Sequence, residues 1–182
     1  KIKQNKNFKV LTYIGSVFKN AQLDSLVKIS MAVNSLNNKK NNLKCFFYFP
    51  ESQKNLYYSY FPKSKNICIY SHNLNDKEYF KVISESDLLI LASNFDDQSI
   101  EYYKYSWPAK MGTYLMSKVP IFISAPKKIY FIDNAIKKFW AFVDSSDSIN
   151  SLETSVEKIL YDLDLRKKVV DNAIIMSKDF EM

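Results

Sequence analysis

The segment SWPAKMGTYLMSKVPI, residues 106–121, places a proline at the start of an expected helix and a lysine on its first turn. Pro108 suits a first helical position because its missing N–H would have no helical partner and its φ angle is preset. Ser106 or Trp107 would then cap the helix. Free amide groups and Lys110 would together attract a diphosphate by about 1–3 kcal/mol. Prolines also open many helices that bind nothing, so the spacing alone leaves a purely structural role open.

Other polar residues directly follow expected strands. Gly15 and Ser16 follow the first, the segment 71–73 follows the third, and Ser93 with Asn94 follows the fourth. In a parallel sheet flanked by helices, ligands bind outside the carboxyl ends of the strands, near the point where the strand order reverses. Position alone therefore singles out as candidate ligand-binding residues Gly15, Ser16, Ser71, His72, Asn73, Ser93, Asn94 and the segment 94–110, which includes Ser106, Trp107, Pro108 and Lys110.

The segment 94–107 is an expected loop of fourteen residues, which is long for a compact domain and typical of functional loops. Its aromatic cluster, residues 102–107, could stack on a sugar or nucleobase, or could pack internally. Asp96 and Asp97 could bind a metal ion, but a solvated turn is the favoured interpretation. His72 could likewise stack on a base or be a satisfied polar residue at a strand end.

Strand-length apolar runs alternate with helix-length amphipathic stretches. Strands are expected at 8–14, 43–49, 66–70, 87–93, 119–124 and 139–143, and helices at 22–37, 52–61, 77–86, 108–117, 128–137, 148–161 and 164–178. The near-continuous apolar run at 87–93 is typical of a central parallel strand. This alternation predicts an α/β fold, a Rossmann-like doubly wound parallel sheet of about six strands, in a single domain over residues 1–182.

Composition excludes several classes of protein. With only two glycines, Gly15 and Gly112, neither a Gly-rich dinucleotide turn nor a P-loop can be built. Cys45 and Cys68 lie in apolar runs and are expected to be buried and free, and one histidine with two scattered cysteines cannot make a zinc site. We therefore expect no metal and no cofactor. Apolar runs are too short to span a membrane.

The net charge of +7 is unevenly distributed. Residues 1–91 contain fourteen basic and six acidic residues, whereas residues 92–182 contain twelve and thirteen. A basic half could favour nucleotides, nucleic acid or an anionic membrane, or could be an ordinary solvated surface. No basic face is interleaved with aromatic residues, so we expect no nucleic-acid partner.

Ser106-x-Pro108-x-Lys110, followed by Tyr114-Leu115 and Val119-Pro120-Ile121, resembles the SxPxKxxEYLAxGxPIL segment of retaining GT-B glycosyltransferases. These group 1 enzymes build polysaccharides and lipopolysaccharides and are related to glycogen synthase. Three further segments resemble the family in the same order: 13–30, 79–93 and 162–173. The resemblance extends from about residue 8 to residue 178.

This resemblance implies the C-terminal, donor-binding half of a two-domain enzyme. Such a half holds a nucleotide sugar, while an N-terminal half supplies most of the site for a saccharide or lipid-linked acceptor. The sequence begins at Lys1 rather than methionine. We therefore expect a fragment, with donor binding but little transfer on its own. The resemblance also implies a cytoplasmic enzyme, and the basic half could bring it to the inner face of a membrane.

The resemblance assigns roles to individual residues. Gly15 corresponds to the turn glycine near the donor phosphates, and Ser16 stands where a basic residue is usual, so Lys19 would take the phosphate-pairing role. Residues 71–73 correspond to the turn beside the nucleobase, and 106–110 to the stretch facing the diphosphate. No catalytic residue is assigned.

Two further positions, besides Ser16, depart from the family pattern. Thr113 replaces the glutamate that holds the donor ribose, and its single hydroxyl oxygen cannot bind both ribose hydroxyls as the two oxygens of a carboxylate do. Lys118 replaces a glycine. The departures at Thr113 and Ser16 favour an alternative, a degenerate domain that binds a partner or a sugar without catalysis.

Overall fold

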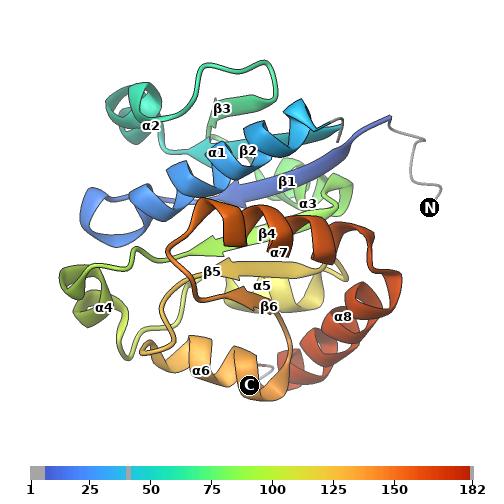
Figure 1. Cartoon of the computed structure of the whole chain (residues 1–182). Helices are drawn as coiled ribbons and strands as arrows, with labels where there is room; N and C mark the ends of the chain where they lie inside the picture. The colour runs from blue at the N-terminus through green and yellow to red at the C-terminus, as the bar shows by residue number, and fades with distance from the viewer. Residues whose placement is uncertain (1–6, 40–41, 181–182) are drawn as a thin grey trace.

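The computed structural model describes residues 7–39 and 42–180, which form three layers with a sheet between two layers of helices (Figure 1). The sheet has six strands in the order β3-β2-β1-β4-β5-β6, and each pairing is parallel. The strands are β1 (Lys9–Ile14), β2 (Leu43–Phe49), β3 (Ile67–Ser71), β4 (Leu88–Ala92), β5 (Ile121–Ser124) and β6 (Phe142–Asp144). The predicted Rossmann-like α/β fold is confirmed.

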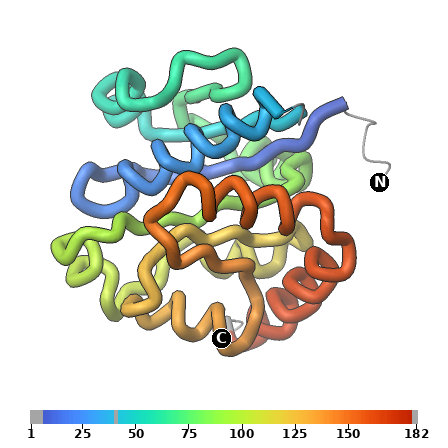
Figure 2. Tube along the Cα trace, in the orientation of Figure 1, coloured from blue at the N-terminus to red at the C-terminus, as the bar shows by residue number. Residues whose placement is uncertain are grey.

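Helices cover both faces of this sheet. The elements are η1 (Lys19–Leu23), α1 (Asp24–Asn38), α2 (Glu51–Tyr57), η2 (Tyr58–Tyr60), α3 (Asp76–Glu85), α4 (Asp97–Tyr103), α5 (Met111–Met116), α6 (Tyr130–Lys138), α7 (Ile149–Tyr161), α8 (Leu163–Ser177) and η3 (Lys178–Phe180). The chain trace shows α1 and α7 side by side on one face (Figure 2). Helices α3, α5 and α6 pack their buried residues on the other face, and α8 contributes to both cores.

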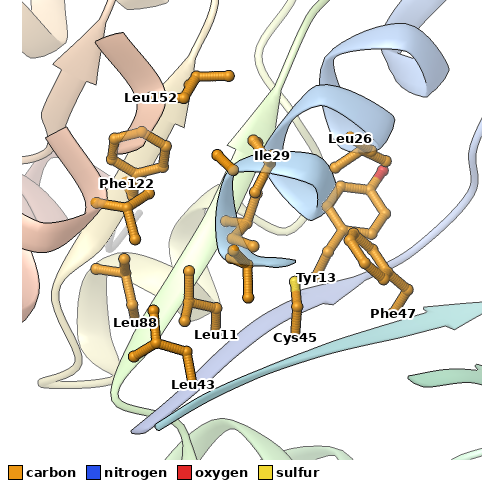
Figure 3. Close-up of a cluster of buried hydrophobic side chains, with 14 of the residues drawn as sticks. Leu11, Tyr13, Leu26, Ile29, Leu43, Cys45, Phe47, Leu88, Phe122 and Leu152 are labelled. Atoms are coloured by element: carbon orange, nitrogen blue, oxygen red, sulfur yellow. The ribbon is translucent and has the colours of Figure 1, made fainter. Parts of the chain in front are cut away.

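The alternation of side chains along β2 explains the larger core. Leu43, Cys45 and Phe47 point to the same face and are fully buried. Leu26 and Ile29, one turn apart on α1, pack in the same core cluster against this face of the sheet (Figure 3). Each such side chain gains about 1.5–3 kcal/mol from leaving water, so the apolar spacing of helix and strand fixes which faces join.

Three expectations about element boundaries are wrong. The segment expected as a loop contains the short helix α4, because the Asp96 carboxylate accepts the backbone N–H of Ser99 and caps it. Helix α5 begins at Met111 rather than at Pro108. The last strand begins at Phe142, since Phe139 adopts a left-handed conformation (φ 55°) that ends α6.

The expectation that both cysteines are buried holds only for Cys45. Cys68 is partly exposed, because it lies on the edge strand β3. Both thiols are free. No helix in the described ranges is long and apolar enough to cross a membrane.

Lys118, between α5 and β5, has a φ angle of 61°. This left-handed conformation favours glycine, because a β-carbon there crowds the following carbonyl oxygen. The family that the sequence resembles has glycine at this position. The chain therefore keeps the turn geometry without the residue that forms it most easily.

Candidate functional site

The candidate site lies where the strand order of the sheet reverses. Strands β1 and β4 are neighbours, and the chain leaves β1 toward β2 but leaves β4 toward β5, in opposite directions across the sheet. Gly15 directly follows β1 and Ser93 directly follows β4. Rossmann-like sheets bind ligands outside the carboxyl ends of their strands at this reversal.

A lysine approaches the Gly15 turn from the segment before α5. The Lys110 ammonium donates a hydrogen bond to the carbonyl oxygen of Ile14 (Nζ–O 2.7 Å) and lies 3.7 Å from the centroid of the Tyr13 ring. Gly15 has a φ angle of 135°, and a β-carbon at this residue would lie 2.8 Å from Lys110 Nζ. A side chain at this position would collide with the ammonium, so glycine allows Lys110 to lie against the turn.

Burial changes the charge state of this lysine. It lowers the pKa of Lys110 to about 7, because the charged form loses hydration when the amine is enclosed. No carboxylate of residues 7–39 and 42–180 forms an ion pair with Lys110. An anion that binds beside Gly15 would supply the opposite charge and favour the protonated amine.

A second group of side chains lies beside this lysine. The His72 ring, after β3, faces the Tyr79 ring with centroids 6.2 Å apart and planes 16° apart. His72 Nδ1 is buried, with no hydrogen-bond partner in the described part of the chain. Burial and, to a smaller degree, the charge of Lys110 lower the pKa of His72. Tyr79 forms a side-chain hydrogen bond with Thr113. His72, Thr113 and Lys110, predicted separately, are thus parts of one neighbourhood.

Buried polar side chains fix the end of β1. The Tyr114 hydroxyl accepts the Ile14 N–H (3.3 Å), and the Gln22 amide donates to the Tyr13 hydroxyl (3.2 Å) and to the Ser16 carbonyl oxygen (2.7 Å). The Tyr13 hydroxyl also donates to the Ser16 carbonyl oxygen (2.6 Å). The Ser16 backbone is therefore held in place, while its side chain faces solvent.

Ser93 and Asn94 connect β4 to the turn after β1. The Ser25 hydroxyl donates to the Ser93 carbonyl oxygen (2.8 Å), and the Asn94 amide donates to the Lys19 carbonyl oxygen (2.8 Å). Ser93 is buried, so its observed contacts are structural. Lys19 is held at this edge of the sheet by its backbone, with its side chain exposed.

Trp107 packs inward as an anchor. Its ring centroid lies 6.3 Å from that of Trp140, nearly parallel to it, and 6.1 Å and 6.2 Å from those of Phe131 and Tyr130. These contacts hold the segment that carries Lys110 against α6. The aromatic cluster in this segment therefore contributes packing through Trp107.

The remaining candidates have simpler surroundings. Ser106 and Asn73 are exposed. The Pro108 carbonyl oxygen accepts the Met111 N–H (2.9 Å), so Pro108 opens a tight turn ahead of α5. The expected caps, Ser106 and Trp107, lie before this turn and do not cap the helix.

Asp96 is engaged in local structure. Its carboxylate accepts the backbone N–H of Ser99 (2.9 Å) and the Ser99 hydroxyl (2.6 Å), and these bonds lower the pKa of Asp96. Across the described residues, no group of three or more histidine, cysteine, aspartate or glutamate side chains is placed to hold a metal ion.

Sequence reasoning missed Tyr79 and Gln22. Tyr79 reads as one more apolar residue of α3, and Gln22 as an ordinary polar residue before α1. No pattern of spacing distinguishes them, because their partners His72, Thr113 and Tyr13 come from other elements.

Comparisons by sequence find no relatives. No protein-family model matches the chain, and no curated protein matches it either.

Comparisons by structure do find similar proteins. The chain is similar to the C-terminal domain of a glycosyl transferase group 1 family protein (LpcC) from Francisella tularensis, with 11% identity and a TM-score of 0.70, covering 97% of this chain and 89% of that one. It is also similar to WaaG, a glycosyltransferase involved in lipopolysaccharide biosynthesis, with 17% identity, a TM-score of 0.61 and coverage of 96% and 44%.

A third similar structure is a trehalose-6-phosphate protein from E. coli bound with UDP-2-fluoro glucose, with 9% identity, a TM-score of 0.62 and coverage of 96% and 43%. The chain thus spans most of the Francisella domain but less than half of the two longer proteins. At these identities the likeness establishes the fold, which is that of the C-terminal domains of GT-B glycosyltransferases.

Proposed function

We propose that this chain is the donor-binding domain of a glycosyltransferase and that it holds a nucleotide sugar through its diphosphate. One observation carries the proposal. The Lys110 ammonium lies at the strand reversal against the Gly15 turn, without a carboxylate partner in the described ranges. A phosphate oxygen that reached this ammonium would accept a charge-assisted hydrogen bond, which is about twice as strong as a neutral one.

The group beside this lysine suits the nucleoside. His72 and Tyr79 offer aromatic faces at the end of β3, where a base could stack, and the unpartnered Nδ1 of His72 could accept or donate a hydrogen bond. Thr113 would contact the ribose through its single hydroxyl, which already bonds Tyr79. Lys19, exposed near the turn, would pair with an outer phosphate oxygen.

In transfer, an acceptor hydroxyl would form a bond to the anomeric carbon while the bond from that carbon to the phosphate oxygen breaks. The electron pair of the broken bond remains on the nucleoside diphosphate, so negative charge grows on the leaving group. A protonated Lys110 would stabilise that charge. The acceptor, a saccharide or a lipid-linked saccharide, would be held by a part of the enzyme outside these residues, so we expect binding without efficient transfer from this chain alone. No metal or cofactor is needed for this role.

The structural likeness supports this proposal without defining the ligand. The E. coli structure contains UDP-2-fluoro glucose, and the Francisella domain comes from a glycosyl transferase.

Calorimetric titration with UDP, GDP, ADP and CMP, followed by the matching nucleotide sugars, tests the proposal. We expect saturable binding of one nucleotide and roughly 10–100-fold weaker binding by Lys110→Met, because a hydrogen bond to a charged group contributes about 1.5–3 kcal/mol. Lys118 is an exposed lysine just after the carboxyl end of α5. Lys118→Met is therefore the matched control and should bind the nucleotide as the native chain does. Absence of binding at millimolar concentrations would contradict the proposal.

A non-catalytic role is the alternative, and two observations favour it. Thr113 offers one hydroxyl, beside Tyr79, where the resembling family has a carboxylate, and Ser16 presents an exposed hydroxyl where that family has a cation. A degenerate domain would bind a sugar or a protein partner but no nucleotide. The same titration separates the two roles.

We also propose that the domain associates peripherally with an anionic membrane. Leu56, Tyr58 and Tyr60 are 63%, 57% and 48% exposed, and the exposed Lys63 and Lys65 follow in the chain. Apolar side chains with flanking lysines suit a negatively charged lipid surface. Equal co-sedimentation with phosphatidylglycerol and phosphatidylcholine vesicles would contradict this association.

A further inference from the structure

A hollow of about 300 Å³ lies outside the Gly15–Lys110 site, between η1 and α4. Its lining consists of Phe18, Asn20, Ala21, Gln98 and Tyr102. Figure 1 shows α4 beside the chain segment that leaves β1, and the two elements contact one another. This volume is at the lower end of the range for small-molecule sites.

The first wall of the hollow is rigid. The Phe18 N–H donates to the Gln22 side chain (3.2 Å), and the Phe18 carbonyl oxygen accepts the N–H groups of Ala21, Gln22 and Leu23 at 3.2, 3.1 and 3.2 Å. The Phe18 side chain is nevertheless 47% exposed. Because the Phe18 backbone is already held by hydrogen bonds, little backbone conformational entropy is lost when a ligand covers the exposed ring.

This wall is also joined to the sheet. Element η1 is a short turn that is kinked at Asn20 (φ −93°, ψ 31°). The Asn94 N–H donates to the Ala21 carbonyl oxygen (2.7 Å), and its side chain donates to the Lys19 carbonyl oxygen (2.8 Å). Since Asn94 comes two residues after β4, the hollow is fixed beside the strand reversal.

The second wall is the outer face of α4. Asp96 caps the helix through Ser99, and Ser99 is fully buried, so the helix is held at its start. Tyr102, 62% exposed, and Gln98 project from this helix into the lining. Two aromatic rings and two carboxamides therefore line one small, preformed space.

We propose that this hollow is a saccharide subsite that binds a neutral hexopyranose ring. The electron-rich faces of Phe18 and Tyr102 can stack on the C–H groups of a sugar ring. The amides of Asn20 and Gln98 can both donate to and accept from hydroxyl groups. The lining carries no charged side chain, which favours an uncharged sugar over a phosphate or a uronic acid. This subsite requires no nucleotide, so it goes beyond the proposed donor site.

The test is a titration of the ¹⁵N-labelled chain with the methyl glycosides of glucose, galactose, mannose and N-acetylglucosamine. We expect the side-chain amide signals of Asn20 and Gln98 to shift saturably with at least one glycoside, with a dissociation constant on the order of 1–10 mM. Tyr102→Ala should weaken binding about fivefold or more through loss of stacking. Tyr58→Ala removes a tyrosine of similar exposure on η2 and should leave binding unchanged.

The inference is overturned if none of the four glycosides shifts these amide signals, or if Tyr102→Ala and Phe18→Ala both bind as the native chain does. Both side chains are exposed, so the variants should retain the native spectrum elsewhere. UDP, GDP, ADP and CMP are titrated into the same samples. Nucleotide binding without sugar binding would overturn the subsite alone, and sugar binding without nucleotide binding would support the subsite while contradicting the proposed donor site.

Discussion

Asp87 and Lys110 are two inward-turned charges at opposite ends of the parallel strands, and their surroundings differ. Asp87 lies at the amino ends of the strands (the amino edge) and Lys110 at their carboxyl ends (the carboxyl edge). Asp87, 7% exposed, lies at the start of β4, and its carboxylate accepts the Val10 N–H (3.0 Å) and faces the Lys9 ammonium (3.5 Å). The Arg166 guanidinium donates to the Asp87 carbonyl oxygen (3.0 Å). Lys110 contacts a carbonyl oxygen and an aromatic face.

The difference separates a structural charge from one available to a ligand. The carboxylate of Asp87 has its opposite charge and its hydrogen-bond donor on β1, and the backbone carbonyl oxygen of Asp87 accepts from Arg166 of α8. The cost of enclosing Lys110 is not offset by a carboxylate of the described residues, and the pKa of its amine falls to about 7. The amino edge thus stabilises the fold, and the carboxyl edge retains a charge that a bound anion would compensate.

The largest expected effect is at the amino edge. Asp87→Ala should lower the free energy of unfolding by about 1.5–3 kcal/mol, because it removes a charged hydrogen-bond acceptor and leaves the buried Val10 N–H without its partner. Urea denaturation measures this change. Asp133→Ala removes an exposed carboxylate paired with Lys137 and should cost at most about 1 kcal/mol. Equal losses in the two variants would show that Asp87 contributes no more to stability than an exposed charge.

The second prediction concerns the pH dependence of stability. The pKa of the Lys110 amine falls from the ordinary lysine value of 10.5 to about 7 on folding, so between these two values the unfolded chain binds more protons. Stability from this group should therefore rise with pH across that window. The free energy of unfolding of Lys110→Met should exceed that of the native chain most near neutral pH. This difference should shrink by a few kcal/mol toward high pH. A difference that is constant with pH would show that the amine titrates normally.

The third prediction concerns the Gly15 turn at the carboxyl edge. Gly15→Ala should lower the free energy of unfolding by about 1–3 kcal/mol through backbone strain at φ 135°, and it should displace Lys110 and weaken nucleotide binding. Gly112→Ala is the matched control, because a β-carbon at Gly112 meets nothing within 4 Å. That control should stabilise α5 by about 0.5–1 kcal/mol. Unchanged nucleotide affinity in Gly15→Ala would separate Gly15 from the anion site.

The smallest effect is expected at Lys118, which lies ahead of β5 on the amino side of the sheet. Lys118→Gly should raise the free energy of unfolding by about 0.5–1 kcal/mol, because glycine adopts the φ angle of 61° without strain. Nucleotide affinity should not change. Thermal unfolding together with calorimetry tests both points, and a loss of stability would show that the Lys118 side chain contributes contacts that outweigh the strain.

The main elements of the fold could be predicted from local pattern. The apolar run at 87–93 becomes β4 at the centre of the sheet, and β2 occupies the expected residues 43–49. Asn75 caps α3 through a capping box with Glu78. In each case the signal is contained within a few neighbouring residues, so periodicity and capping rules suffice.

The parts that failed depend on distant contacts or on weak signals. Helix α4 has seven residues and only one fully buried side chain, Ser99, so it shows no apolar periodicity. Tyr58 and Tyr60 are exposed whereas the neighbouring Phe61 is buried in the core, and no local pattern distinguishes them. Trp107 reads as a ligand residue until Trp140, from another segment, is placed against it.

The candidate site was predictable in position more than in chemistry. Gly15, His72 and Lys110 follow from strand ends and from the resemblance of residues 106–121. The burial of the Lys110 ammonium depends on contacts with Tyr13 and Ile14, about a hundred residues earlier in the chain. No local sequence pattern predicts these contacts. The assignment of Trp107 as a donor-binding residue now competes with its packing role against α6.

The most direct test of this account is an NMR measurement of the pKa of Lys110, with selectively labelled lysine and Lys110→Met for assignment. We predict a pKa near 7 in the free chain and a higher value in the presence of whichever nucleoside diphosphate binds, because the diphosphate favours the charged amine. A free-chain pKa close to that of the exposed lysines, unchanged by every nucleotide, would contradict the claim that this inward-turned lysine is the anion-binding group of the site.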